Sequence, residues 1–170
     1  MRASGVIVDG SSYDVAFLDG TCIALYAGCD ESSDLTFQTA ARAAMASQAL
    51  LDQVSLDDID VSDSFPDLTN GISDPERGVV STPHGLADPV TFPGQVEISF
   101  ANNFGHPSRG NQFDVGSSPG IGREVISFDL VLAPSGVEAV WTPVPEPGTA
   151  ALLGLGPIGL AAKGRQRSRS

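Results

Sequence analysis

Two cysteines, Cys22 and Cys29, have the type and spacing that most directly suggest a chemical bond. They are seven positions apart and are flanked by residues that favour turns. A pair this close can form a disulfide in an oxidising compartment, where a short bridge contributes ~2–3 kcal/mol. The alternative is two free thiols. We expect no metal site here, because His84 and His106 lie far apart in the sequence and neither fits a Cys/His ligand spacing.

Acidic side chains are frequent in residues 55–78, where Asp is interleaved with Ser, Pro, Asn and Gly. Carboxylates at alternating positions can chelate Ca²⁺. The run Asp57–Asp67 lacks the central Gly and the closing Glu of an EF-hand loop. The main prediction is therefore a solvated acidic loop. The alternative is a Ca²⁺-dependent adhesion module that uses Asp57–Asp74.

No group of residues in the sequence predicts catalysis. Acids are plentiful, but no pair has a spacing that indicates general acid–base chemistry. With only two histidines in the chain, the order of Ser, His and Asp is uninformative. We therefore expect no catalytic residues and no cofactor, and we keep a secreted hydrolase with paired carboxylates as an alternative.

The last 27 residues, 144–170, consist of three parts in order. Val144 precedes the triplet Pro145-Glu146-Pro147, an apolar stretch spans residues 149–162, and the chain then ends in a basic segment. The basic residues are Lys163, Arg165, Arg167 and Arg169. The apolar stretch is shorter than the ~20 residues of an ordinary transmembrane helix, so it predicts a short and marginal one. Basic residues after a span stay in the cytoplasm, which would leave the body outside.

This tail resembles the PEP-CTERM sorting signal of Gram-negative bacteria. The resemblance covers residues 144–170 and rests on the Val144–Pro147 motif, the Gly- and Leu-rich stretch and the Arg-rich end. It implies that an exosortase, a transpeptidase-like membrane enzyme, recognises Pro145, Glu146 and Pro147 and cuts the signal. It also implies a transient stay in the inner membrane. After processing, the body would be released or attached to the cell surface or the exopolysaccharide matrix.

The N-terminus shows no secretory signal peptide, because its apolar run is only Val6–Val8 and Asp9 ends it. Either the chain stays inside the cell, or its true start lies upstream of Met1. Since the tail indicates export, we expect the second. Charge is consistent with an extracytoplasmic body: residues 1–143 hold 20 acidic and five basic side chains, a net charge of −15. Residues 144–170 carry a net charge of +3. Such a body would repel nucleic acid, which is bound mainly through Lys and Arg.

The clearest predicted element is a helix over residues 40–54, with Asp34, Thr36 or Thr39 as its cap. Its apolar positions recur at intervals of three and four, as expected of a helix that packs on a sheet. Residues 79–123 are predicted to be rich in loops apart from a half-buried strand at 95–100.

Two hairpins are predicted from strand-forming residues beside turn signals. The first pairs residues 13–18 with 21–26 around Asp19-Gly20, and the second pairs 124–132 with 137–142, where Trp141 is predicted to pack in the core. The chain is thus predicted to be an α+β body, 1–143, with a mostly antiparallel sheet and one main packing helix. The sorting signal, 144–170, would add a short C-terminal apolar helix.

Overall fold

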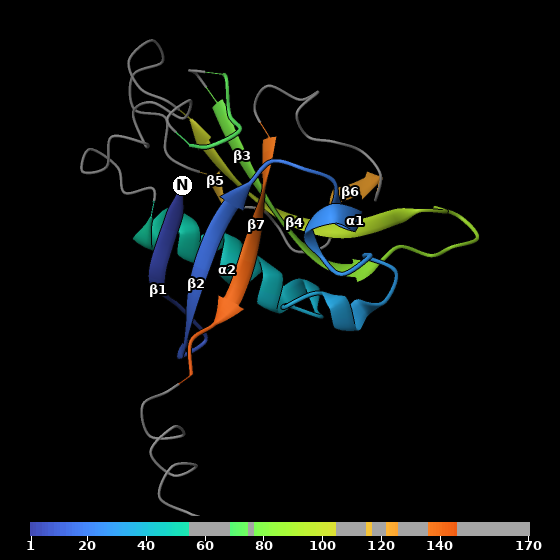
Figure 1. Cartoon of the computed structure of the whole chain (residues 1–170), viewed down its shortest axis with the longest axis horizontal. Coiled ribbons are helices and arrows are strands. Elements are labelled where there is room, and N and C mark those ends of the chain that lie inside the picture. The colour runs from blue at the N-terminus through green and yellow to red at the C-terminus, as the bar shows by residue number, and fades with distance from the viewer. Residues whose placement is uncertain (55–68, 75–76, 105–114, 117–121, 126–135, 146–170) are drawn as a thin grey trace, which may run out of the picture.

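The chain forms a twisted sheet with one long helix behind it (Figure 1). The computed structural model describes residues 1–54, 69–74, 77–104, 115–116, 122–125 and 136–145. Within these residues the seven-stranded sheet has the order β1-β2-β7-β3-β4-β5, and β6 also pairs with β4. The strands are β1 (Arg2–Val8), β2 (Ser11–Leu18), β3 (Arg77–Leu86), β4 (Gln95–Phe104), β5 (Val115–Gly116), β6 (Gly122–Val125) and β7 (Gly136–Pro143). Every pairing is antiparallel except that of β3 with β7, which confirms the predicted sheet type.

The predicted helix is present as α2 (Ala40–Gln53), which crosses one face of the sheet (Figure 1). Its cap is Thr39, whose side-chain oxygen accepts a hydrogen bond from the Arg42 N–H at 3.3 Å. The predicted apolar stripe is buried in the main core together with side chains of β1, β2, β3, β4 and β7. We call the side of the sheet that packs against α2 the inner face, and the opposite side the outer face.

The first predicted hairpin is wrong: the hairpin lies one segment earlier, between β1 and β2. Its turn is Asp9-Gly10, and both residues have positive φ, 50° and 76°, as a two-residue turn between twisted strands requires. The two edges of β2 are therefore occupied by β1 and β7. Residues 22–25, predicted as a strand, form the short helix α1 (Cys22–Leu25), because the Thr21 side chain caps it by accepting from the Ala24 N–H at 3.2 Å.

The segment after β2 covers part of the outer face. It contains α1 and the 3-10 turn η1 (Ser32–Asp34). Its buried residues form a second apolar cluster with two residues of β4. The members of this cluster are Cys22, Tyr26, Cys29, Leu35, Val96 and Ile98. The sheet is thus covered by α2 on its inner face and partly by this segment on its outer face.

The expectation of loops over most of residues 79–123 is wrong for β3, which contains Pro83, and for β4, which extends to Phe104. Proline favours a loop because it lacks the N–H that a central strand donates. β3, however, pairs with β7 only over Val79–Ser81, so Pro83 lies beyond that pairing. The β3–β4 register also shifts between Pro83 and Gly85, which accommodates the ring.

The second predicted hairpin is also wrong in its pairing. Its later strand is present as β7, but β7 pairs with β2 and β3, whereas β6 pairs with β4. Residues 126–135 lie outside the described part of the chain. Trp141 is 4 % exposed, as predicted for a core residue. Its ring lies 5.3 Å from that of Phe37 and 6.0 Å from that of Tyr13, and its Nε1–H donates to the Thr82 hydroxyl at 3.3 Å.

The outer edge of β1, an end strand of the sheet, is partly covered by a side chain of α2. The Ile7 N–H donates to Gln53 Oε1 at 2.9 Å, and Gln53 Nε2 donates to the Ile7 carbonyl at 2.9 Å. The amide thus satisfies the same two backbone groups that a neighbouring strand would bind, which protects an exposed edge against pairing with another chain.

Candidate functional site

The predicted sorting signal begins where β7 leaves the sheet. The last hydrogen bond of the described chain to the body runs from the Val144 N–H to the Ser12 carbonyl, at 2.9 Å. Val144 and Pro145 are exposed. The rest of the predicted motif, Glu146 and Pro147, lies outside the described residues. So do Lys163, Arg165, Arg167 and Arg169, and the predicted C-terminal apolar helix.

Hydroxyl groups satisfy the backbone on the other side of β7. Tyr26 Oη donates to the Ala139 carbonyl at 2.7 Å, and Thr36 Oγ1 donates to the Trp141 carbonyl at 2.8 Å. The backbone N–H and C=O groups of the odd-numbered residues of β7 therefore point away from β2, because the backbone hydrogen bonds of successive residues alternate between the two edges of a strand. Pro143 is one of these residues. Because the position of its missing N–H points away from β2, the proline costs no hydrogen bond between β7 and β2. The body thus holds β7 on both edges up to the start of the motif.

A comparison with known protein families identifies this C-terminal segment. The family model of the PEP-CTERM protein-sorting motif matches residues 143–168. The chain carries a PEP-CTERM sorting signal. The signal marks the protein for export and for processing by an exosortase, as its resemblance implied. No curated protein and no solved structure matched the chain.

The PEP-CTERM match begins at Pro143, the last residue of β7. Sheet and signal are therefore contiguous, with no spacer between them. Sequence reasoning placed the motif but missed Ser12, Tyr26 and Thr36, the residues that hold the strand leading into it. No spacing in the sequence indicates such contacts. The carbonyls that Tyr26 and Thr36 bind lie 105 positions or more away along the chain.

The structure joins Cys22 and Cys29 in a disulfide, with Cα atoms 5.8 Å apart. Both residues are fully buried. Cys29 is brought back over α1 by a tight turn in which Ala27, Gly28 and Cys29 all have positive φ, and the Cys29 N–H donates to the Tyr26 carbonyl at 2.6 Å. The bridge therefore fixes the loop that carries Tyr26, one of the residues that bind β7.

Of the two histidines in the chain, only His84 lies within the described residues. His84 is 3 % exposed on β3, and His106 lies outside the described residues. Burial lowers the pKa of His84 below its ordinary value of 6.5, while the nearby Glu97 carboxylate opposes that shift. Inside the sheet, His84 is neutral at pH 7 and out of reach of a substrate.

The predicted acidic loop is only partly described. Asp57–Asp67 lies outside the described residues, whereas Asp74 lies inside and is half-buried. Within the described ranges, no three or more His, Cys, Asp or Glu side chains come close enough to hold a metal ion. In the same ranges, no helix has the length and apolar character needed to cross a membrane.

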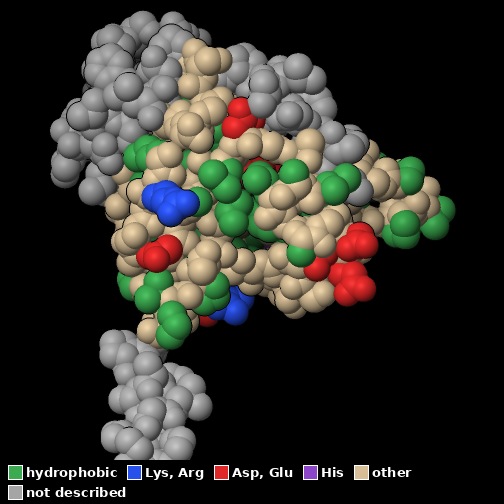
Figure 2. Space-filling view, viewed as in Figure 1, with side chains coloured by type: hydrophobic (Ala, Val, Ile, Leu, Met, Phe, Trp, Pro, Cys, Tyr) green, Lys and Arg blue, Asp and Glu red, His purple; other side chains and the backbone are tan. Residues whose placement is uncertain are grey.

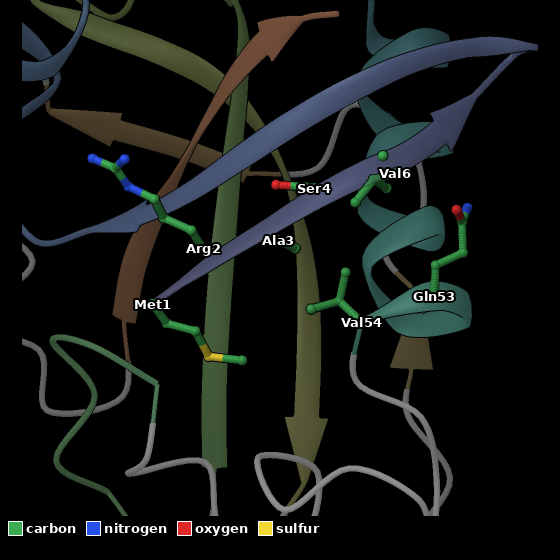
Figure 3. Close-up of a pocket in the computed structure, with 8 residues that line it drawn as sticks. Met1, Arg2, Ala3, Ser4, Val6, Gln53 and Val54 are labelled. Atoms are coloured by element: carbon green, nitrogen blue, oxygen red, sulfur yellow. The ribbon is translucent and has the colours of Figure 1, made fainter.

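A pocket of about 260 Å³ lies between β1 and the end of α2 (Figure 3). Its lining consists of Met1, Arg2, Ala3, Ser4, Gly5, Val6, Gln53 and Val54. None of these residues is an acid, a histidine or a cysteine, and the Gln53 amide is already bound to Ile7. The lining therefore offers no nucleophile–base pair and no set of metal ligands.

Proposed function

We propose that this is a non-enzymatic exported protein, sorted to the cell surface or the exopolysaccharide matrix when an exosortase processes its C-terminal signal. The observation that carries the proposal is the match of residues 143–168 to the PEP-CTERM protein-sorting motif, which starts at the last residue of β7. The body, residues 1–143, is the part that is exported, and residues 144–170 are its sorting signal.

The disulfide and the charge of the body support delivery outside the cytoplasm. A bridge such as Cys22–Cys29 forms and persists in oxidising compartments. Acidic side chains far outnumber basic ones in the body, and on the face seen in Figure 2 few basic groups appear among the described residues. An excess of negative charge favours solubility after release and disfavours nucleic acid as a partner.

In this proposal the body crosses the inner membrane first, and the apolar stretch 149–162 then holds it there. The basic end remains in the cytoplasm by the positive-inside rule. The exosortase cuts at the motif, and the body is then released from the membrane or attached to the cell surface or the exopolysaccharide matrix. Within the described residues, His84 is buried and the pocket beside β1 is lined without acids, histidines or cysteines, and the proposal assigns no catalytic residue.

The test is expression of the full chain, with an added export signal and a C-terminal epitope tag, in hosts with and without an exosortase. We expect the tag to leave the body only in the exosortase-positive host. Replacing Glu146 with Gln in the same host is a matched control that should slow this loss. A tag that stays attached to the exported body in the exosortase-positive host would contradict the proposal.

A further inference from the structure

We propose that the exosortase contacts the folded body as well as the motif, and that it docks on a rim formed by Ile7, Ser12 and Val144. We call these three residues the exit rim. The inference rests on the proposed function and deepens it, because it adds to the motif residue Val144 two contacts, Ile7 and Ser12, that are far from the motif in sequence.

The exit rim is a row across three strands. Ile7 of β1 is paired with Ser12 of β2, and the Ser12 carbonyl accepts the hydrogen bond from the Val144 N–H. The neighbouring pair on β2 and β7, Tyr13 with Pro143, sets the same register. Adjacent strands lie ~4.8 Å apart, so Ile7 and Val144 are separated by ~10 Å with the small Ser12 between them.

The side chains of this row share the outer face. Val6 and Val8 are buried toward α2, so Ile7 between them points the other way. Ile7 is 47 % exposed and Val144 is 37 % exposed, two of the large apolar side chains that the described body leaves open to solvent. Figure 2 shows apolar side chains gathered near the place where the chain leaves the body.

Chain geometry places an enzyme at the motif beside this rim. Pro145 directly follows Val144, and a chain advances at most ~3.6 Å per residue. An enzyme that binds the chain from Pro145 onward therefore begins its contacts next to Val144. Ser12 and Ile7 continue the same row across β2 and β1, so an enzyme surface that extends along the row covers two exposed apolar side chains.

Charge favours a protein surface over lipid as the occupant. Asp9, in the β1–β2 turn, and Asp14, whose carboxylate accepts from the Gly5 N–H at 3.2 Å, are both exposed beside the rim. Burying Ile7 and Val144 in lipid would bring these carboxylates toward the hydrocarbon, where an unpaired charge is costly. A protein can offer donors to them and apolar contacts to Ile7 at the same time.

The test measures how fast the exported full chain loses its C-terminal tag in an exosortase-positive host, by pulse–chase. Ile7→Thr keeps a β-branched strand residue but removes apolar surface, and we expect it to slow processing about three- to tenfold. The matched control is Ile23→Thr, the same change at a residue that is 43 % exposed on α1. α1 lies toward the other end of the sheet from β1 (Figure 1), so this control should process at the wild-type rate.

A second variant separates docking from damage to the fold. A flexible insertion of about ten Gly and Ser residues between Val144 and Pro145 removes the fixed distance between rim and motif. We expect the insertion to slow processing, and we expect Ile7→Thr to slow it much less in that background than in the original chain. An Ile7→Thr effect of equal size in both backgrounds would overturn the proposal.

The outcomes are distinguishable from failure of the proposed function. A wild-type chain that keeps its tag overturns both the sorting role and the exit rim. A wild-type chain that is processed while Ile7→Thr shows an unchanged or faster rate overturns the exit rim alone.

Discussion

Removing the Cys22–Cys29 bridge should destabilise the body by ~3–4 kcal/mol. The bridge joins residues at a sequence separation of 7. For a loop of that size the chain-entropy relation gives ~2.5 kcal/mol. Replacing both cysteines with alanine also removes two fully buried sulfur atoms, which adds ~1 kcal/mol of lost packing. The loss is large against a typical total of ~5–15 kcal/mol.

Urea unfolding of the exported full chain measures this loss. With a slope of ~2 kcal/mol/M, the midpoint of the Cys22→Ala/Cys29→Ala variant should fall by ~1.5–2 M, and reductant should lower the wild-type midpoint by a little less. Ser33→Ala, an exposed change in the same segment, should leave the midpoint unchanged. A midpoint that falls by less than ~0.5 M in the double variant would refute the claim that the bridge fixes the β7-binding segment.

Three further predictions concern hydrogen bonds and protonation. Tyr26→Phe should lower the free energy of unfolding by ~1–3 kcal/mol, because the buried Ala139 carbonyl loses its donor, and a midpoint equal to wild type would contradict this. Gln53→Ala should cost ~1–2 kcal/mol and promote self-association through the uncovered β1 edge, which sedimentation can detect as a dimer or larger species. The folded-state pKa of His84 lies below 6.5, so the unfolded chain binds more protons, and stability should fall as the pH drops below that value. His84→Gln should lose this part of the pH dependence, and equal pH profiles for the two chains would disprove the assignment.

The helix and the tail were predictable because each has a strong local signal. α2 combines an uninterrupted run of helix formers with apolar spacing, and only the choice of Thr39 over Asp34 and Thr36 as the cap needed the structure. The sorting signal is a contiguous motif, so its recognition needs no knowledge of the fold.

The strand pairings were not predictable, because pairing depends on contacts between distant residues. Two Asp-Gly pairs occur near the N-terminus, and the one at Asp9-Gly10 forms the hairpin, whereas Asp19-Gly20 leads into α1. Nothing local separates the two, since both follow strand-forming residues. β7 likewise has a clear strand pattern, but its neighbours β2 and β3 lie far from it in sequence.

The residues of the candidate site divide in the same way, into those with a local sequence signal and those whose place depends on strand pairing. Val144 and Pro145 were identified from the motif, and Cys22 and Cys29 from their spacing. Ser12 and Ile7 could not be identified, because their relation to Val144 exists only through the register of three strands. A serine near a turn signal and an isoleucine in a short apolar run are too common to indicate proximity to a tail that follows more than 130 positions later.

The intact mass of the body recovered from an exosortase-positive host tests the central claim most directly. The account predicts a body that ends within or close to the Pro145–Pro147 triplet, so its mass lacks the apolar stretch and the basic end. In a host without exosortase, the chain should retain its full C-terminus. An exported body from the exosortase-positive host whose mass still includes residues 148–170 would contradict the account.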